Sequence, residues 1–288
     1  MTPADRLEAA EARGLFAAEV SKPDAELNLA RATLLVGKGE EPRACDVGRC
    51  LARLDEMGEE ARARISRGGE SPVGALNRYL FEEQGFAGNV SDYYDPRNSM
   101  LHRVLERRLG IPITLSVVYM EVGRRAGLRV EGVGLPGHFV VRAYESDDAS
   151  EDSAGTLVDP FNRKVTDLEE CQQRVDGIYE GMMRLTEEHA RAASARTILV
   201  RILGNLKAVY VKAQLFGRAL AAVERILLVT PHDLEERRDR GMLLAQLNRM
   251  KEAIADTQTY LNLAPNASDA DAVREQLKKM QIRLAMLN

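Results

Sequence analysis

Tryptophan is absent from this sequence, and aromatic residues make up only 5% of it. Cysteine is almost as scarce: Cys45, Cys50 and Cys171 are odd in number and lack the spacing of metal ligands. No segment approaches the roughly 20 apolar residues of a membrane span, and the N-terminus has no apolar core of the kind found in signal peptides. We therefore expect a soluble, reduced, cytoplasmic protein without disulfide framework, membrane anchor, metal or cofactor.

An excess of positive charge is also lacking. Lysine and arginine number 40 against 44 acidic residues, which gives a formal net charge of −4. Nucleic-acid binding normally requires a basic surface, so no nucleic-acid partner is expected. The length of 288 residues suits about two domains, and the abundance of Ala, Leu, Arg and Glu favours helix over most of the chain.

The first 70 residues are predicted to form a helical subdomain. Helices are expected at 25–36 and 45–65, separated by a turn that ends at Pro42. Cys45 and Cys50 would then lie five residues apart on one helix, where they do not face each other well. We interpret all three cysteines as small buried hydrophobic residues, the usual role of free cysteine.

A single central stretch, residues 110–161, carries nearly all of the β signal. Pro112 suits the first turn of a helix, the apolar residues after it recur at three- and four-residue steps, and Gly127 can end the helix. Strands are predicted at 129–135, 138–144 and 156–159, with the acidic segment 145–152 as a solvated hairpin tip. This stretch is expected to form the core of a domain spanning residues 71–185.

The order of these elements is that of a Cys-His-Asp acyl-transfer site. His138 opens the second strand, and Asp159 ends the third. Such sites place a thiolate at the start of the helix, where the helix dipole lowers its pKa. Residues 111–116 contain no cysteine, so the histidine and its aspartate lack the usual nucleophile. Structural roles remain open: a core histidine, and an aspartate that accepts backbone N–H bonds in a turn.

Thr114 and Ser116 are candidate hydroxyl nucleophiles on the same helix, with His138 as the base. The alternative for both is a structural bond to a carbonyl one turn earlier. A second group of candidates lies in or near the long polar loop 85–99, a length that is often functional. Binding roles are open there and on the second strand for the following residues: Tyr94, Arg97, His102 and Arg142.

The C-terminal region, residues 186–288, contains a repeat. Ala219 and Ala253 lie 34 residues apart, as do Pro231 and Pro265. This period, with a small residue and a terminal proline, resembles the tetratricopeptide repeat. Lys207 stands where glycine is usual in the first unit, and 270–287 is predicted as the capping helix. A concave face of such a solenoid binds a protein or peptide segment.

Four sequence phrases resemble the transglutaminase-like superfamily, papain-like in layout, and within it the bacterial SirB-type family. They are ALNRYLFEEQGFAGN, DYYDPRNSMLHRVLERRLGIPITLSVVYMEV, GVGLPGHFVVR and DPFN. That family combines a helical region, a transglutaminase-like core and C-terminal tetratricopeptide repeats, and related cores occur in some eukaryotic F-box proteins. The resemblance covers nearly the whole chain and implies an α+β, mostly helical fold: a buried helix with a small antiparallel sheet, followed by an α-solenoid.

Carried over by position, the resemblance makes His138 the catalytic histidine and Asp159 its aspartate. The nucleophilic cysteine would fall at or near Pro112, and a slippage of one or two residues would reach Thr114. Two functions follow as hypotheses. The first is a non-catalytic interaction, scaffold or regulatory module. The second is a hydrolase or acyltransferase on amide or ester bonds that uses His138 and Asp159 with a hydroxyl or water.

Overall fold

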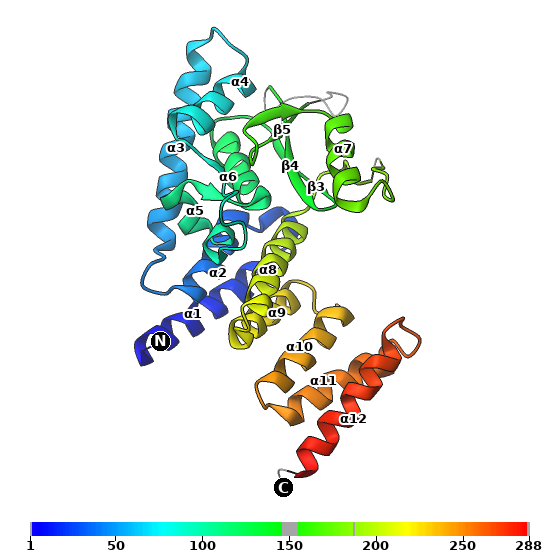
Figure 1. Ribbon diagram of the computed structural model, residues 1–288. Coiled ribbons are helices and arrows are strands. Elements are labelled where there is room, and N and C mark those ends of the chain that lie inside the picture. The colour runs from blue at the N-terminus through cyan, green and yellow to red at the C-terminus, as the bar shows by residue number, and fades with distance from the viewer. Residues whose placement is uncertain (1, 146–154, 187, 287–288) are drawn as a thin grey trace. The chain divides into compact units, whose positions relative to one another are not determined.

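The computed structural model describes residues 2–145, 155–186 and 188–286. The chain divides into two compact units, residues 1–202 and 203–288, which are described separately below. Helices dominate both units, and the first also contains a small antiparallel sheet (Figure 1). The predicted mostly helical α+β fold is therefore confirmed. Most of the predicted acidic hairpin tip, residues 146–152, lies outside the described residues.

The first unit begins with a run of helices, and its four sheet strands follow one another between α6 and α7. Its elements are α1 (Pro3–Val20), η1 (Asp24–Glu26), α2 (Leu29–Glu40), α3 (Val47–Arg67), α4 (Pro72–Asn77), η2 (Arg78–Glu83, a π-helix), β1 (Ala87–Gly88), η3 (Pro96–Ser99), α5 (Leu101–Arg107), β2 (Leu109–Gly110), α6 (Pro112–Arg125), β3 (Val130–Leu135), β4 (His138–Ala143), β5 (Thr156–Asp159), β6 (Lys164–Thr166), α7 (Leu168–Tyr179) and the start of α8 (Ala195–Lys212).

The N-terminal helices begin at side-chain caps. Asn28 accepts from the Arg31 N–H at the start of α2, and Asp46 accepts from the Arg49 N–H at the start of α3. The prediction that the third helix starts at Cys45 was therefore wrong by two residues. Because Asp46 occupies the N-cap, Cys45 lies in the segment before the helix.

The four-stranded sheet has the order β3-β4-β5-β6, with every neighbouring pair antiparallel. The three predicted strands are confirmed within one residue, whereas β6 and the short parallel pair β1–β2 were not predicted. Val133 pairs with Val140, and both pack on Cys171 of α7. On the opposite face, α6 packs so closely on β3 that a Cβ at Gly123 would lie 2.7 Å from Val130. The sheet is thus a layer between α6 and α7 (Figure 1).

Helix α6 forms the centre of this unit. Residues 111–119 are all buried, and α3 crosses the other end of the helix at very short range. A Cβ at Gly58 of α3 would lie only 2.3 Å from the Cβ of Arg125. Gly127, with φ of +91°, follows the helix as expected for a C-terminal glycine.

The second unit consists of antiparallel helices. After the end of α8 come α9 (Phe216–Val229), α10 (Leu234–Gln246), α11 (Met250–Leu263) and α12 (Ala270–Met286). Helix α9 packs on α10, α10 on α11 and α11 on α12, as repeat stacking requires. The repeat-related Ala219 and Ala253 are both fully buried, so the 34-residue period corresponds to a packing period. The predicted helical solenoid is confirmed.

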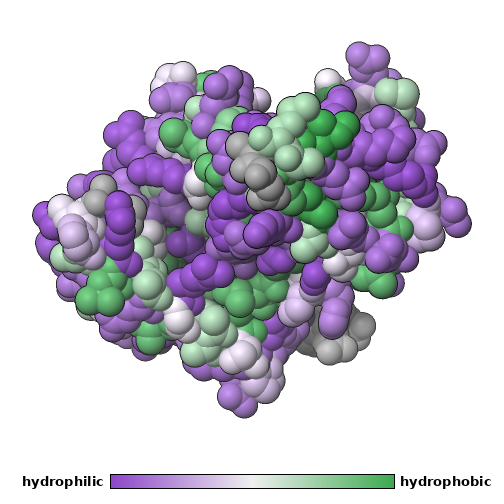
Figure 2. Space-filling view, turned by 90° about the horizontal axis from the view of Figure 1, so that it is seen from below, coloured by the Kyte–Doolittle hydropathy of each residue, from purple (hydrophilic) through white to green (hydrophobic). Residues whose placement is uncertain are grey.

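The surface carries hydrophobic side chains in separate patches between hydrophilic ones on the face drawn in Figure 2. Among the described residues, the most exposed large hydrophobic side chains include Met182, Met286 and Val90. None of the helices in the described ranges has both the length and the apolar character needed to cross a membrane.

We predict that Gly58→Ala destabilises the protein by about 1–3 kcal/mol, the usual cost of overpacking, because its methyl group would displace Arg125 and separate α3 from α6. Gly14→Ala is the matched control. Gly14 is an exposed glycine within α1 with no atom within 4 Å of an added Cβ, so alanine should stabilise by about 0.5–1 kcal/mol through helix propensity alone. Urea unfolding of both variants measures the difference, and equal effects would contradict the close approach.

Candidate functional site

His138 and Asp159 are brought together by the sheet. A tight turn with Gly137 at φ +69° reverses the chain so that His138 begins β4 opposite Leu135. Strand β5 ends beside it at Asp159. His138 Nε2 lies 2.8 Å from Asp159 Oδ2, and the two residues are only 4% and 3% exposed. The sequence-predicted pair is therefore in direct contact within the protein interior.

Asp159 is also held by the turn that follows it. Its Oδ1 accepts from the backbone N–H groups of Phe161 and Asn162, both at 3.1 Å, and the Asn162 side-chain amide donates to Oδ2 at 2.7 Å. The guanidinium of Arg174 lies 3.8 Å from the same oxygen. Both roles considered for Asp159, orienter of the histidine and acceptor in a turn, thus coexist.

The charge state of Asp159 determines which imidazole nitrogen faces it as a hydrogen-bond donor. Burial alone would raise the pKa of this carboxyl, but the hydrogen bonds and charge of His138, together with the bonds from Asn162, outweigh burial and hold the pKa below its usual value. An ionised carboxylate only accepts hydrogen bonds, so Nε2 of His138 must be the donor. In the neutral imidazole, Nδ1 is then the nitrogen able to accept a proton.

Phe161 packs against this pair. Its ring is perpendicular to the imidazole, with centroids 6.4 Å apart. On the other side, the ring lies so close to Gly88 that a Cβ there would be 2.6 Å from it. Tyr93 contacts Phe161 edge-on at 6.0 Å, and Tyr94 contacts Tyr93 at 5.5 Å. An aromatic row thus runs from the histidine to the long loop.

The start of α6, where a nucleophile would stand, has a different role. Thr114 Oγ1 donates to the Asn98 carbonyl at 2.6 Å and accepts from the Ile111 N–H at 3.2 Å. Ser116 Oγ is enclosed and has no hydrogen-bond partner among the described residues. Both residues are fully buried. In the described structure, therefore, neither hydroxyl is hydrogen-bonded to His138.

Asn98 organises the long loop around this point. It is fully buried, and its amide donates to the carbonyls of Asp92 and Tyr93 while its Oδ1 accepts from Asn89. Asn89 in turn donates its backbone N–H to Gly110, next to α6. The loop is thus ordered by buried amides.

The remaining candidates occupy three other places. Arg97 bonds the Asp95 carboxylate through Nε at 2.9 and 3.0 Å. His102 faces the N-terminal helices, with Nε2 2.9 Å from Glu41. Arg142 lines a pocket of about 550 Å³ with Leu135, Gln172 and His189. Tyr94 alone of these four belongs to the aromatic row beside His138, and its side chain is exposed.

Sequence reasoning missed three contributors to the site, of which two, Phe161 and Asn162, lie in the turn after Asp159. Both belong to the phrase Asp-Pro-Phe-Asn, in which only the aspartate was assigned a role. An asparagine three residues after an aspartate at a strand end is a signal for a turn closed on the carboxylate. Arg201 was missed as well: its guanidinium donates to the carbonyls of Leu135 and His138, both at 2.6 Å, and no local pattern pointed to it.

A buried helix, a hairpin that opens with histidine, and a strand that ends in its aspartate define a transglutaminase-like core, here followed by helical repeats. The family described as Transglutaminase-like superfamily matches residues 48–204, and a Tetratricopeptide repeat family matches residues 206–278. The chain belongs to the transglutaminase-like superfamily and, by its relatives, to the UPF0162 proteins.

The UPF0162 relatives are bacterial proteins, and they match most of this chain. A UPF0162 protein of Xylella fastidiosa is 39% identical over 261 residues, which cover 88% of this chain and 90% of the relative. A UPF0162 protein of Vibrio cholerae is 28% identical over 230 residues, 80% of each chain. F-box only protein 21 of Mus musculus is 33% identical over 140 residues, 46% of this chain and 21% of that protein. No solved structure matches the chain. The name SirB-type is not carried by these relatives and stays a prediction.

We predict a pH-dependent loss of stability in Asp159→Asn. Because the folded-state pKa of Asp159 is lowered, its ionised form stabilises the fold above the unfolded pKa, near 3.8, and this contribution disappears as the pH falls further through the folded pKa. The variant should be about 1–3 kcal/mol less stable than the wild type at neutral pH. Urea unfolding at a series of pH values should show the difference shrinking below about pH 4. A difference independent of pH would contradict an ionised Asp159.

We also predict that Thr114→Val destabilises by about 1–3 kcal/mol, because the Asn98 carbonyl and the Ile111 N–H lose a buried partner. Thr114→Ser, which keeps the hydroxyl, is the matched control and should lose less. Thermal unfolding compares the two. If valine were tolerated as well as serine, the hydroxyl would have no structural role.

Proposed function

We propose that this protein is a non-catalytic member of the transglutaminase-like superfamily that acts as a protein-interaction, scaffold or regulatory module. The observation that carries the proposal is the start of α6. No cysteine stands there, Thr114 is engaged by Asn98 and Ile111, and Ser116 is enclosed. An acyl-transfer reaction needs an accessible nucleophile next to its base, and neither hydroxyl offers one.

The surroundings of the histidine support the same proposal. The side chains of His138 and Asp159 are 3% and 4% exposed, and Phe161 packs edge-on against the imidazole. A substrate carbonyl would have to come within about 3 Å of both a nucleophile and the donors of an oxyanion hole. The pair instead joins β4 to the turn after β5, a structural use of a histidine and an aspartate.

The C-terminal unit supplies the interaction part of the proposal. Residues 206–278 match a tetratricopeptide repeat family, and stacked helical repeats present extended surfaces that bind protein segments. A protein or peptide is therefore the partner class we propose for this unit, in the cytoplasm. No nucleic acid is proposed, given the formal charge of −4.

A second candidate rests on the His138–Asp159 geometry itself. A carboxylate that fixes Nε2 as the donor leaves Nδ1 of a neutral imidazole as a base, which is the protonation state that general-base catalysis uses. With a water molecule in place of the missing thiol, this pair would support hydrolysis of an amide or ester bond. The candidate requires that water and substrate reach the imidazole past Phe161.

Turnover by the purified full chain distinguishes the two candidates. We predict that hydrolysis of a chromogenic ester, and amine transfer to a glutamine-containing peptide, proceed at the same background rate with wild type and with His138→Ala. His189→Ala is the matched histidine control outside the pair, and thermal unfolding verifies that each variant is folded. A wild-type rate at least about tenfold above His138→Ala, with His189→Ala unchanged, would overturn the non-catalytic proposal. Thr114→Val and Ser116→Ala would then separate a hydroxyl nucleophile from water.

A further inference from the structure

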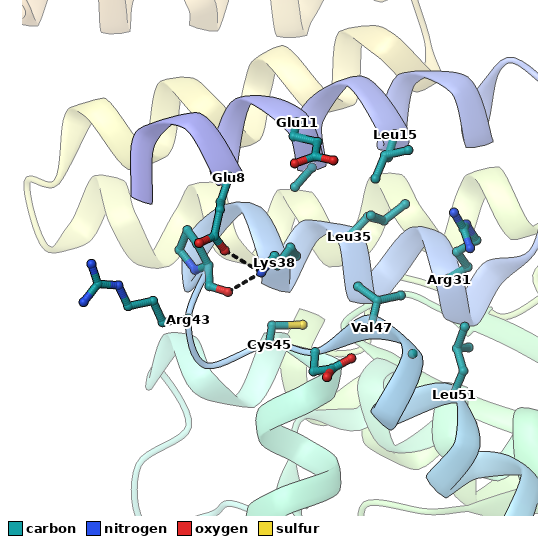
Figure 3. A pocket seen from close by; sticks show the side chains of 14 residues that line it. Glu8, Glu11, Leu15, Arg31, Leu35, Lys38, Arg43, Cys45, Val47 and Leu51 are labelled. Atoms are coloured by element: carbon teal, nitrogen blue, oxygen red, sulfur yellow. Dashed lines mark hydrogen bonds and ion pairs between the residues drawn. The ribbon is translucent and has the colours of Figure 1, made fainter. Parts of the chain in front are cut away.

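Three pockets of similar volume, about 550 to 660 Å³, lie within the first unit. In the pocket of Figure 3, between α1, α2 and α3, Lys38 is paired with Glu8 at 2.7 Å. In the pocket between α3 and α5, Arg103 is paired with Glu106 at 2.7 Å. Acidic residues thus belong to the walls of both pockets, where they neutralise part of the positive charge.

The third pocket, of about 550 Å³ between the sheet and α7, combines apolar and basic side chains without any acidic residue in its wall. Arg142 of β4 and Arg191, which follows α7, are the two charged residues that line it. Within the described parts of the chain, neither guanidinium forms an ion pair or a hydrogen bond. The apolar side chains of the wall are Leu135, Leu168, Leu185 and Ala190.

The strand pairing places Arg142 on the pocket side of the sheet. Arg142 follows Val140 by two residues on β4, and Val140 packs toward α7, so both side chains leave the sheet on the same face. Glu131 stands opposite Arg142 in the register, but its carboxylate accepts hydrogen bonds from Arg129 and from the Tyr144 hydroxyl. The acidic residue nearest in the sheet therefore has other partners.

Arg191 is placed by a segment that runs along the free edge of β3. The Ala193 N–H donates to the Gly132 carbonyl at 2.8 Å, and Ala192 forms a β-bridge with Val133. These backbone contacts hold the residues around Arg191 beside the sheet. The exposed side chain of Arg191 thus lines the pocket from a fixed backbone position.

Gln172 of α7 braces the wall between the two arginines. Its amide donates to the Met183 carbonyl at 3.0 Å and to the Asp176 carboxylate at 2.7 Å, and its carbonyl oxygen accepts from the Leu185 N–H at 2.8 Å. These three hydrogen bonds connect α7 to the segment that follows it. The wall is therefore preformed, as the walls of small-molecule sites usually are.

We propose that this pocket binds an aliphatic carboxylate, a small free acid whose carboxylate pairs with Arg142 and Arg191 and whose hydrocarbon chain contacts the leucines of the wall. Guanidinium groups bind carboxylates through two parallel N–H···O bonds, and two guanidiniums suit the two oxygens of one carboxylate. A pocket of about 300–1,000 Å³ with an apolar wall and a few polar groups is the usual form of a small-molecule site.

The proposed site lies on the same face of the sheet as His138 but at a distance from it. His138 pairs with Leu135 in the register, and His138 and Arg142 are four residues apart on β4. Four residues span about 13 Å along a strand. The carboxylate would therefore be bound away from the imidazole, and the proposal depends neither on catalysis by His138 nor on the proposed interaction role of the repeats.

Isothermal titration calorimetry of the full chain with octanoate tests the proposal. Saturable binding is expected, and Arg142→Gln and Arg191→Gln should each weaken it about ten- to a hundredfold, because each removes a charged hydrogen-bond donor. Arg184→Gln is the matched control, since the Arg184 side chain is 78% exposed and does not line the pocket. This variant should bind octanoate as the wild type does. Thermal unfolding verifies that each variant is folded.

Further probes separate the charge from the hydrocarbon chain. Octanamide keeps the chain without the charge and should bind about ten- to a hundredfold more weakly than octanoate. Acetate keeps the charge without the chain and should bind at least about a hundredfold more weakly. Ala190→Phe, which fills the apolar part of the pocket and retains both arginines, should also prevent octanoate binding.

Four results would overturn the proposal: no saturable octanoate binding up to about 1 mM, octanamide bound as tightly as octanoate, undiminished binding in both arginine variants, or undiminished binding in Ala190→Phe. Octyl phosphate and acetyl-Gly-Gly-Leu present an apolar group with a different anion or at a peptide terminus. Tighter binding of either one than of octanoate would contradict a free aliphatic acid as the ligand. Should Arg142→Gln fail to fold, the exposed Arg191 still provides the decisive variant.

Discussion

The burial of α6 on all sides is the constraint on which the first unit depends. The helix has β3 and β4 on one face, α3 on another, and the parallel β1–β2 pair at its N-terminus. A buried N-terminus leaves backbone N–H groups that need partners, and Thr114 supplies one for Ile111 while it also ties down the Asn98 carbonyl. In this protein, Thr114, at the start of the helix where a nucleophile would stand, serves to cap the helix.

The His138–Asp159 pair obeys the same requirement that buried polar groups have hydrogen-bond partners. A carboxylate that is only 3% exposed is tolerable because every hydrogen bond it accepts comes from its own turn or from the facing histidine. Arg201 similarly donates hydrogen bonds to the carbonyls of Leu135 and His138 at the hairpin turn. A histidine and an aspartate at these positions are therefore compatible with stability as well as with chemistry, and contact between them does not by itself establish catalysis.

How much of this was visible in the sequence depended on the range of the interaction. Pro112, Gly127 and the β-rich composition of 129–135 act locally, so the helix and strands were predicted within a residue or two. The contact of His138 with Asp159 was anticipated because both stand at strand ends. The hydrogen bond from Thr114 to the Asn98 carbonyl joins residues that lie 16 positions apart. No periodic pattern in the sequence predicts such a contact. One local rule was misapplied: Asp46 was not recognised as a cap, which displaced Cys45 onto the helix.

Lys207 distinguishes the first repeat unit from the second. It stands where Gly241 stands in the second unit, and its ammonium reaches Glu236 and Asp239 of α10 at 2.5 and 2.9 Å. Gly241, in contrast, lies against Thr257 at a distance that admits no side chain. The two units are consequently not interchangeable. A copy of the first unit placed behind the second would therefore need acidic side chains in the following helix to pair with its lysine.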